Sequence, residues 1–200
     1  DVLPDASLPG NTIVDGQGLS EATAGVRETI FIQARDQFGN NRRNGGDTLT
    51  METSGWNMRI ADCVLGRPEC TYMASIIDSR DGSYNASYMI TYSAVYQWRI
   101  AIEGVNVWNH NLQTYEPWAV LTSAAQSYPP YCTFTGIGRY GGYLLQRITF
   151  SIKTRDQFYN ERTDGALWRR DNFEVTIVGA SDFALEYNTV LVPNITDPNT

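Results

Sequence analysis

TIFIQARDQFGNNRRNG at residues 29–45 decides the fold of this chain, because it returns 120 positions later (149 − 29) as TFSIKTRDQFYNERTDG at residues 149–165. The motif Arg-Asp-Gln-Phe-x-Asn stands at the centre of both copies, at residues 35–40 and 155–160. A repeat with a fixed period indicates tandem structural units, each built from one copy. The chain is therefore expected to hold two related domains rather than one.

Alternation of apolar and polar residues predicts strands in both units. One face of each predicted strand is apolar, as in the three sets Ile30, Ile32 and Ala34; Tyr84, Ala86 and Tyr88; Trp98, Ile100 and Ile102. Short strands separated by turn residues about every ten positions favour a β-sandwich. The predicted fold is all-β: an extended N-terminal segment (residues 1–15), then two tandem immunoglobulin-like β-sandwich domains (residues 16–122 and 123–200).

Spaced motifs in the first unit resemble the filamin-type immunoglobulin repeat. The resemblance covers residues 10–121 closely and 130–180 more loosely, and it rests on Gly18-Leu19, Ala24-Gly25, Ala34-Arg35-Asp36, Gly39-Asn40, Gly45-Gly46-Asp47, Asp81-Gly82, Tyr84, Tyr88 and Tyr96. Val95 stands where that family usually has Gly. The resemblance implies the fold and not an activity, because filamins bind actin through a separate helical domain and one fold hosts many functions.

Composition excludes some classes of protein, and two accessible sequons favour an extracellular glycoprotein. The net charge of −7 argues against nucleic-acid binding, which needs a basic surface. No apolar stretch approaches the roughly 18 residues of a membrane span. Two sequons, at Asn85 and Asn194, are candidate N-glycosylation sites, and the strand pattern predicts that Asn85 faces solvent. Pro129 and Pro130 are candidate hydroxyproline O-glycosylation sites between the two domains.

Three cysteines are present. Cys63 and Cys70 flank a predicted turn, so they are expected to form a disulfide, with two free thiols as the alternative. Cys132 is left over and is either free and buried or paired outside its own domain. No zinc site is predicted, because the spacing of the cysteines is wrong and one histidine, His110, is available.

The residues do not favour an enzyme, and no cofactor is predicted. His110 is the single histidine, so no Ser-His-Asp arrangement can form. The repeated Arg-Asp pair is interpreted as structural, with Asp36 and Asp156 accepting hydrogen bonds from turn amides. The aromatic residues Trp108, Tyr115 and Trp118 are expected to pack between the two domains, with stacking on sugars as the alternative.

The second unit is expected to be incomplete. Asp171 corresponds to Asp47 with an offset of 124 (171 − 47), so Thr200 corresponds to position 76 and the last two strands of the first unit have no counterpart. The alternative is that Leu185–Val192 supplies one divergent strand. A sandwich without these strands exposes an edge that accepts a strand from another chain. The expected donor is the neighbour's N-terminal segment, through its apolar residues Val2, Leu3, Leu8, Ile13 and Val14.

Three functions follow from this organisation. The leading hypothesis is a non-enzymatic subunit of an extracellular glycoprotein fibre, which binds copies of itself head to tail. The second is a cell-surface adhesion module that binds a partner peptide at the exposed edge. The third is a fragment of a longer filamin-like array of repeats.

Overall fold

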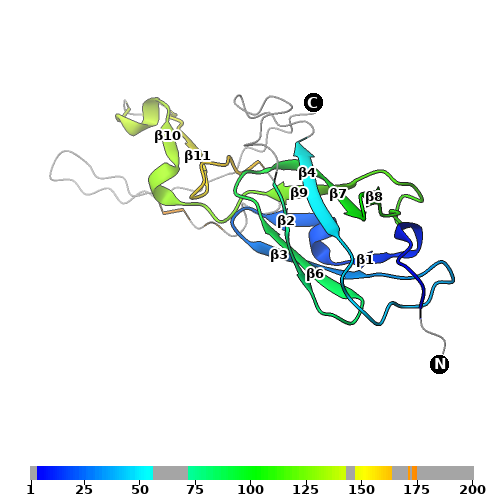
Figure 1. The fold of residues 1–200 in the computed structure, drawn as a ribbon. Coiled ribbons are helices and arrows are strands. Elements are labelled where there is room, and N and C mark those ends of the chain that lie inside the picture. Colours follow the sequence, from blue (N-terminus) through cyan, green and yellow to red (C-terminus); the bar gives the residue numbers. More distant parts are fainter. Residues whose placement is uncertain (1–3, 56–71, 143–146, 164–170, 172, 175–200) are drawn as a thin grey trace.

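The structure is a computed structural model and describes residues 4–55, 72–142, 147–163, 171, 173 and 174. Within these residues the regular structure consists of β-strands and short 3₁₀ turns, as Figure 1 shows. The all-β fold class is thereby confirmed. Apolar alternation explains it, because alternate side chains of a strand point to opposite faces of a sheet.

The first unit is a sandwich of two sheets. One sheet has the order β1-β3-β6-β5, with strands Ile13–Asp15, Arg27–Gln33, Ser83–Met89 and Ser75–Asp78. The other has the order β2-β9-β7-β4, with strands Glu21–Thr23, Trp118–Ser123, Ala94–Ile102 and Leu49–Gly55, and the two-residue strand β8 (Val105–Asn106) pairs with β7. Strand β2 runs parallel to β9, whereas the other pairs are antiparallel.

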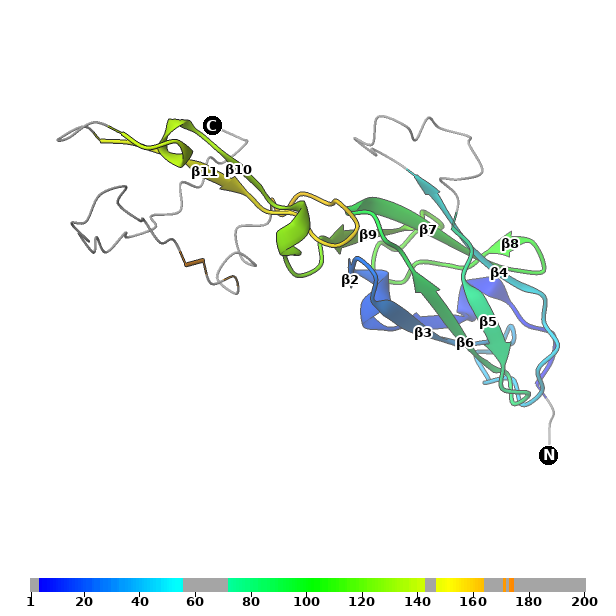
Figure 2. The ribbon, with the colours of Figure 1, turned by 90° about the vertical axis from the view of Figure 1, so that its left-hand side faces the viewer.

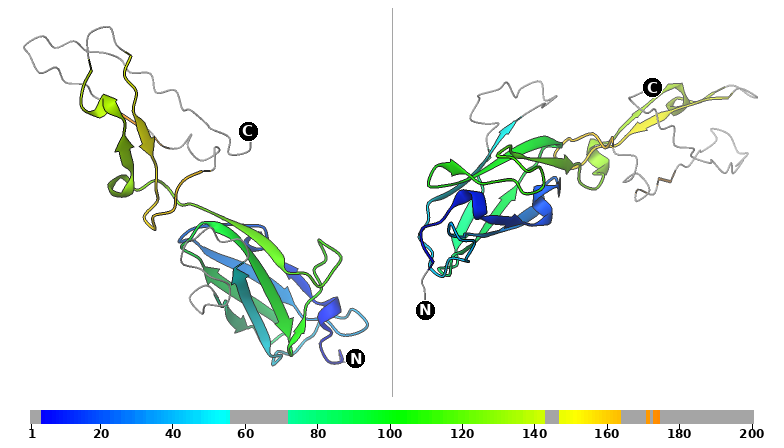
Figure 3. Two further views of the ribbon diagram at one scale, coloured as in Figure 1. Left: turned by 90° about the horizontal axis from the view of Figure 1, so that it is seen from above. Right: turned by 90° about the vertical axis from the view of Figure 1, so that its right-hand side faces the viewer.

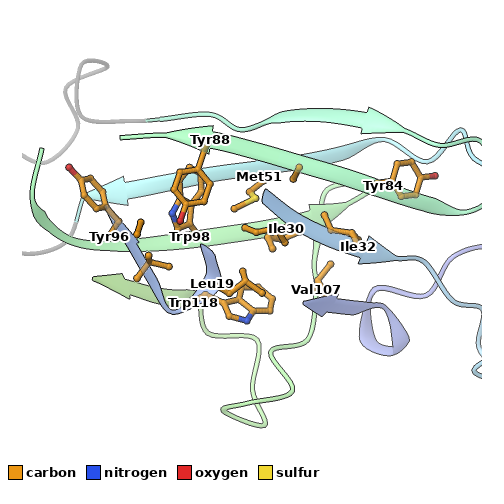
Figure 4. Close-up of a cluster of buried hydrophobic side chains, with 14 of the residues drawn as sticks. Leu19, Ile30, Ile32, Met51, Tyr84, Tyr88, Tyr96, Trp98, Val107 and Trp118 are labelled. Atoms are coloured by element: carbon orange, nitrogen blue, oxygen red, sulfur yellow. The ribbon is translucent and has the colours of Figure 1, made fainter. Parts of the chain in front are cut away.

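The core lies between the two sheets, and both supply its aromatic side chains (Figure 4). Tyr88 of β6 packs on Trp98 of β7 with ring centroids 4.4 Å apart. The predicted inward faces are confirmed, since every residue of the three sets above is buried. Burial of this much aromatic and aliphatic surface is the main source of the sandwich's stability.

The second unit repeats the beginning of the first. Its strands β10 (Thr133–Thr135) and β11 (Ser151–Lys153) pair in the register of β1 and β3, shifted by 120 residues. A 3₁₀ turn precedes the first strand in both units, η1 at Pro9–Asn11 and η4 at Pro129–Tyr131. A second turn follows it, η2 at Gln17–Leu19 and η5 at Ile137–Arg139. Figure 2 shows β10 and β11 beyond the end of the first sandwich, away from the N-terminus.

The structure places the described part of the N-terminal segment, residues 4–15, against the first unit. Residues 13–15 are strand β1 and pair with β3 of the same chain. Upstream, the N–H of Leu8 donates to the Arg35 carbonyl at 2.7 Å, as the N–H of Tyr128 does to the Arg155 carbonyl at 2.7 Å. The period of 120 thus includes this segment, a fact that Pro9 and its counterpart already signal in the sequence.

Several predicted sites lie outside the described residues. They are Val2, Leu3, Cys63, Cys70 and Asn194. The disulfide between the two cysteines and the glycan at Asn194 therefore stay predictions. Phe173 and Glu174, which follow the expected counterpart of Asp47, are described and lie outside regular structure.

Candidate unit-to-unit interface

The corner that follows β3 is organised by Asp36, which is 1% exposed. Its Oδ1 accepts hydrogen bonds from the backbone N–H groups of Phe38 and Asn40, both at 2.9 Å. Its Oδ2 accepts one from the Asn40 side chain at 3.0 Å and one from the N–H of Asp5 at 3.3 Å. The hydrogen bond from the Asn40 side chain is the largest cause that lowers the pKa of Asp36, and burial opposes it. The predicted structural role of this carboxylate is confirmed.

The second corner has the same construction. Asp156 Oδ1 accepts from the N–H groups of Phe158 at 2.8 Å and Asn160 at 3.0 Å. Its Oδ2 accepts from the Asn160 side chain at 2.7 Å and from the N–H of Ala125 at 2.9 Å. Since Asp5 and Ala125 are also 120 residues apart, the two corners are held by equivalent atoms.

The second corner contacts the first unit through Asn160. Its side-chain Nδ2 donates to the Thr91 carbonyl at 2.7 Å, and its Oδ1 accepts from the Ser93 N–H at 2.9 Å. Both partners lie in the loop between β6 and β7, at the end of the first unit that faces β10 and β11 (Figure 3). The amide therefore bonds one backbone acceptor and one donor of this loop at once, and Asn160 is only 8% exposed.

Phe158 supplies the apolar part of the same contact. Its ring lies over Gly25, so closely that a Cβ on this glycine would overlap Cε2 and Cζ of the ring. Gly25 has φ +75, a left-handed conformation that suits glycine, and its N–H donates to the Ile90 carbonyl at 2.7 Å. Because Gly25 has no side chain, the Phe158 ring can lie directly on its backbone. We call the surface made by Gly25, Thr91 and Ser93 the Gly25 recess.

The two corners differ at one backbone position. Gly39 in the first corner has φ +81, and Tyr159 in the second has φ +68. A non-glycine residue in this left-handed backbone conformation is strained by about 1 kcal/mol or more. The Tyr159 ring stacks on Tyr131 with centroids 3.9 Å apart, which helps to offset that strain. The second unit therefore has an aromatic pair on its surface beside the junction.

The expected packing of three aromatic residues between the domains is wrong. Trp118 is buried in the core of the first sandwich. Trp108 packs edge-on against Tyr115, with ring centroids 4.7 Å apart, and the backbone N–H of Trp108 donates to the Pro9 carbonyl at 3.4 Å. This pair therefore lies beside η1. The junction uses Gly25, Phe158 and Asn160 instead, and the sequence signal for them is an apolar Phe kept in both polar turns.

The candidate glycosylation residues that the structure describes lie on the surface. Asn85 is exposed on β6, flanked across the sheet by Phe31 and Ile77. Its predicted orientation toward solvent is confirmed, whereas the glycan stays a prediction. Pro129 and Pro130 are exposed in η4, where a proline suits the start of a turn.

The remaining predicted residues have local structural partners. Cys132 is free, and its Sγ donates to the Tyr128 carbonyl at 3.4 Å. Thr12, its counterpart in the first unit, makes the equivalent bond from Oγ1 to the Leu8 carbonyl at 3.2 Å. Of the expected donor residues, Leu8 is 42% exposed, and Ile13 and Val14 are half-buried in β1.

No group of three His, Cys, Asp or Glu side chains within the described residues is placed to hold a metal ion. Within the same residues, no helix has the length and apolar character that crossing a membrane requires.

Comparisons with known proteins show the fold. No protein-family model matches the chain, and no curated protein matches it by sequence. Among solved structures, the Escherichia coli adhesin FdeC matches with a TM-score of 0.58 and 17% identity, over 82% of this chain and 46% of that one. Invasin, a bacterial integrin-binding protein, matches with a TM-score of 0.53 and 16% identity, over 79% and 28%. The chain thus has the immunoglobulin-like fold and spans less than half the length of either structure.

Proposed function

We propose that this chain is a non-enzymatic segment of an extracellular or cell-surface protein, in which two immunoglobulin-like units form a spacer of fixed orientation. Such a spacer holds a binding site away from a surface or extends a fibre. The observation that carries this proposal is the junction, where Asn160 bonds Thr91 and Ser93 and Phe158 covers Gly25. A freely jointed pair of domains needs no such contacts.

The adhesion function of the structural neighbours supports a surface location. FdeC is described as an adhesin and invasin as an integrin-binding protein. For this chain we propose the same general setting and leave the bound partner undefined. The acidic charge of −7 and the exposed sequon at Asn85 agree with an extracellular environment.

The fixed orientation is tested by residual dipolar couplings of the full chain in a dilute aligning medium. The wild-type chain is expected to give one alignment tensor for both units. The double variant Phe158→Ala, Asn160→Ala is expected to give two different tensors, because both the apolar and the polar contact are lost. Gln157→Ala, an exposed residue of the same turn, is the matched control and keeps one tensor. Two tensors in the wild-type chain would refute the spacer.

The surface location needs a separate experiment. An antibody against the first unit is applied to intact source cells and to the same cells after permeabilisation. Labelling of intact cells is expected, and signal restricted to permeabilised cells would refute this part of the proposal.

Fibre assembly by strand complementation is a second candidate, favoured by the edge of β11 that has no partner strand within the described residues. Within the described residues β11 pairs with β10 alone, whereas its counterpart β3 also pairs with β6. Phe134 of β10 is 40% exposed and packs edge-on against Phe150. An incoming strand would extend this pair and cover its apolar side chains.

The donor of that strand is less well supported than its acceptor. Ile13 and Val14 already pair with β3 of their own unit, and β10 already occupies the equivalent place in the second unit. A neighbour's N-terminal segment would therefore have to leave β3 and take the place of a β6-like strand. Electron microscopy of the intact chain at increasing concentration tests the candidate. Filaments support it, and single particles at every concentration refute it.

A further inference from the structure

The two corners of the repeat have equivalent internal bonds but different surroundings. Phe158 and Asn160 are engaged by the Gly25 recess. Phe38 and Asn40, 120 residues earlier, are exposed, and Phe38 is 76% exposed. A phenylalanine this exposed, on a turn whose other side chains are polar, presents apolar surface that has no covering partner within the described residues.

The exposed corner lies at the far end of the first unit from the junction. Strand β3 starts at Arg27, next to Gly25, and runs to Gln33, just before the corner. Seven residues of strand span about 20 Å. The first unit thus carries a recess at one end and an unfilled copy of the docking corner at the other.

Each contact atom of the docked corner has an available counterpart in the exposed one. Asn160 uses Nδ2 and Oδ1 at the junction while Nδ2 also holds Asp156. In the first corner Asn40 Nδ2 holds Asp36 in the same way, and the exposed side chain faces solvent. The corner is therefore already shaped for docking, and binding would require little rearrangement.

We propose that the corner at residues 35–40 is a docking surface for a third immunoglobulin-like unit, one that presents a recess built like that of Gly25, Thr91 and Ser93. Phe38 would cover the glycine of that recess. Asn40 would bond the carbonyl and the N–H of its β6–β7 loop. The inference rests on the tandem part of the proposed function and is independent of the surface location.

The second unit of another copy is a poor fit for this role. The residue 120 positions after Gly25 is Leu145, and the Phe38 ring needs a position without a side chain. The recess of the first unit is already filled by Phe158. The occupant is therefore a unit that has glycine at the position of Gly25. It would come before the first unit, just as the first unit comes before the second.

The test adds such a unit to the intact chain. Residues 1–123 are joined by protein ligation ahead of residues 4–200, which restores the natural spacing, since residue 4 is the counterpart of residue 124. Only the added copy carries ¹⁵N, so its Gly25 and Ser93 amides are observed without overlap. The tether gives a local concentration in the millimolar range, which is sufficient for a weak contact.

The added copy is expected to dock. Its Gly25 and Ser93 amide shifts should match those of the natural chain, where Phe158 and Asn160 occupy the recess. Phe38→Ala together with Asn40→Ala in the following copy should move both shifts and make the Ser93 amide exchange roughly tenfold faster, because one hydrogen bond is lost. Gln37→Ala, on the same exposed turn, should change neither.

Identical shifts and exchange rates with and without Phe38 and Asn40 would overturn the inference. The same amides in the natural chain, compared between wild type and Phe158→Ala, Asn160→Ala, separate this failure from failure of the proposed function. If the natural junction responds and the added one does not, the corner of the first unit has no docking role. If neither responds, both the inference and the fixed spacer are refuted.

Discussion

Replacement of Gly25 by alanine is expected to act on the first unit and on the junction at once. Gly25 has φ +75, where an L-residue costs about 1–2 kcal/mol. The new Cβ would overlap the Phe158 ring, so the ring must move away. Phe158 is half-buried, and loss of its packing costs about 1 kcal/mol, less than the value for a fully buried side chain. Gly25→Ala should therefore lower the free energy of unfolding of the first unit by about 2–3 kcal/mol.

A double-mutant cycle with Phe158→Ala separates the two contributions. Phe158→Ala alone should cost about 1 kcal/mol, because only the packing is lost. The double variant should cost about as much as Gly25→Ala alone, since that substitution has already displaced the ring. The costs are thus expected to be non-additive by about 1 kcal/mol, within the range usual for residues in direct contact.

The assay is urea unfolding followed through the indole N–H resonance of Trp98. This side chain is fully buried in the core of the first sandwich, so its signal reports on that unit alone. Leu121→Ala, on the exposed face of β9, serves as a matched control that should show no coupling with Phe158→Ala. Additive costs for Gly25 and Phe158 within about 0.5 kcal/mol would refute the direct contact.

Three further outcomes are expected. The folded-state pKa of Asp36 is lowered from 3.8, so the contribution of this carboxylate to stability is complete above pH 3.8 and is lost as the pH falls through the folded-state pKa. The difference in the free energy of unfolding between wild type and Asp36→Asn should therefore close on acidification. A difference that stays constant with pH in urea titrations would contradict this. Burial raises the pKa of Tyr84 to about 12, so its hydroxyl stays protonated and donates to Asp47 Oδ2 at 2.8 Å. Tyr84→Phe should lower the free energy of unfolding by about 1–2 kcal/mol, measured by urea unfolding. An unchanged free energy of unfolding would show that this hydrogen bond adds nothing to stability. Intact mass of the secreted chain should fall by one glycan with Asn85→Gln, and equal masses apart from the substitution would exclude a glycan there.

The sheet pattern of the first unit was predictable because burial sets it residue by residue. Ile30, Tyr84 and Trp98 lie on alternating positions, and a shift of one residue would turn each of them to solvent. The fate of residues 1–15 was not predictable in this way, because β1 has three residues and carries no clear alternation. The recurrence of Pro9 as Pro129 indicates only that the repeat extends upstream of residue 15, and the pairing of β1 with β3 is seen in the structure alone.

The junction was predictable only in part. The recurrence of Phe and Asn in two polar turns identifies residues under a shared constraint, but the internal bonds of the turn already account for Asp36 and Asn40. The sequence contains no sign that one Phe is covered and the other exposed. That difference depends on Gly25, which is far from Phe158 along the chain and whose role in the contact follows from its φ and its position at the end of β2.

The two units are therefore not interchangeable, although they share a period. The first has a docking corner and the Gly25 recess, and the second keeps the corner but has leucine at the position of the glycine. Under the proposed docking, a further Phe-on-Gly contact can therefore be added at the corner of the first unit, whereas the second unit has no glycine at the matching sequence position. If copies of this chain do form a fibre, the contact beyond the second unit must use different chemistry. The edge of β11, which within the described residues pairs with β10 alone, is a feature that could supply it.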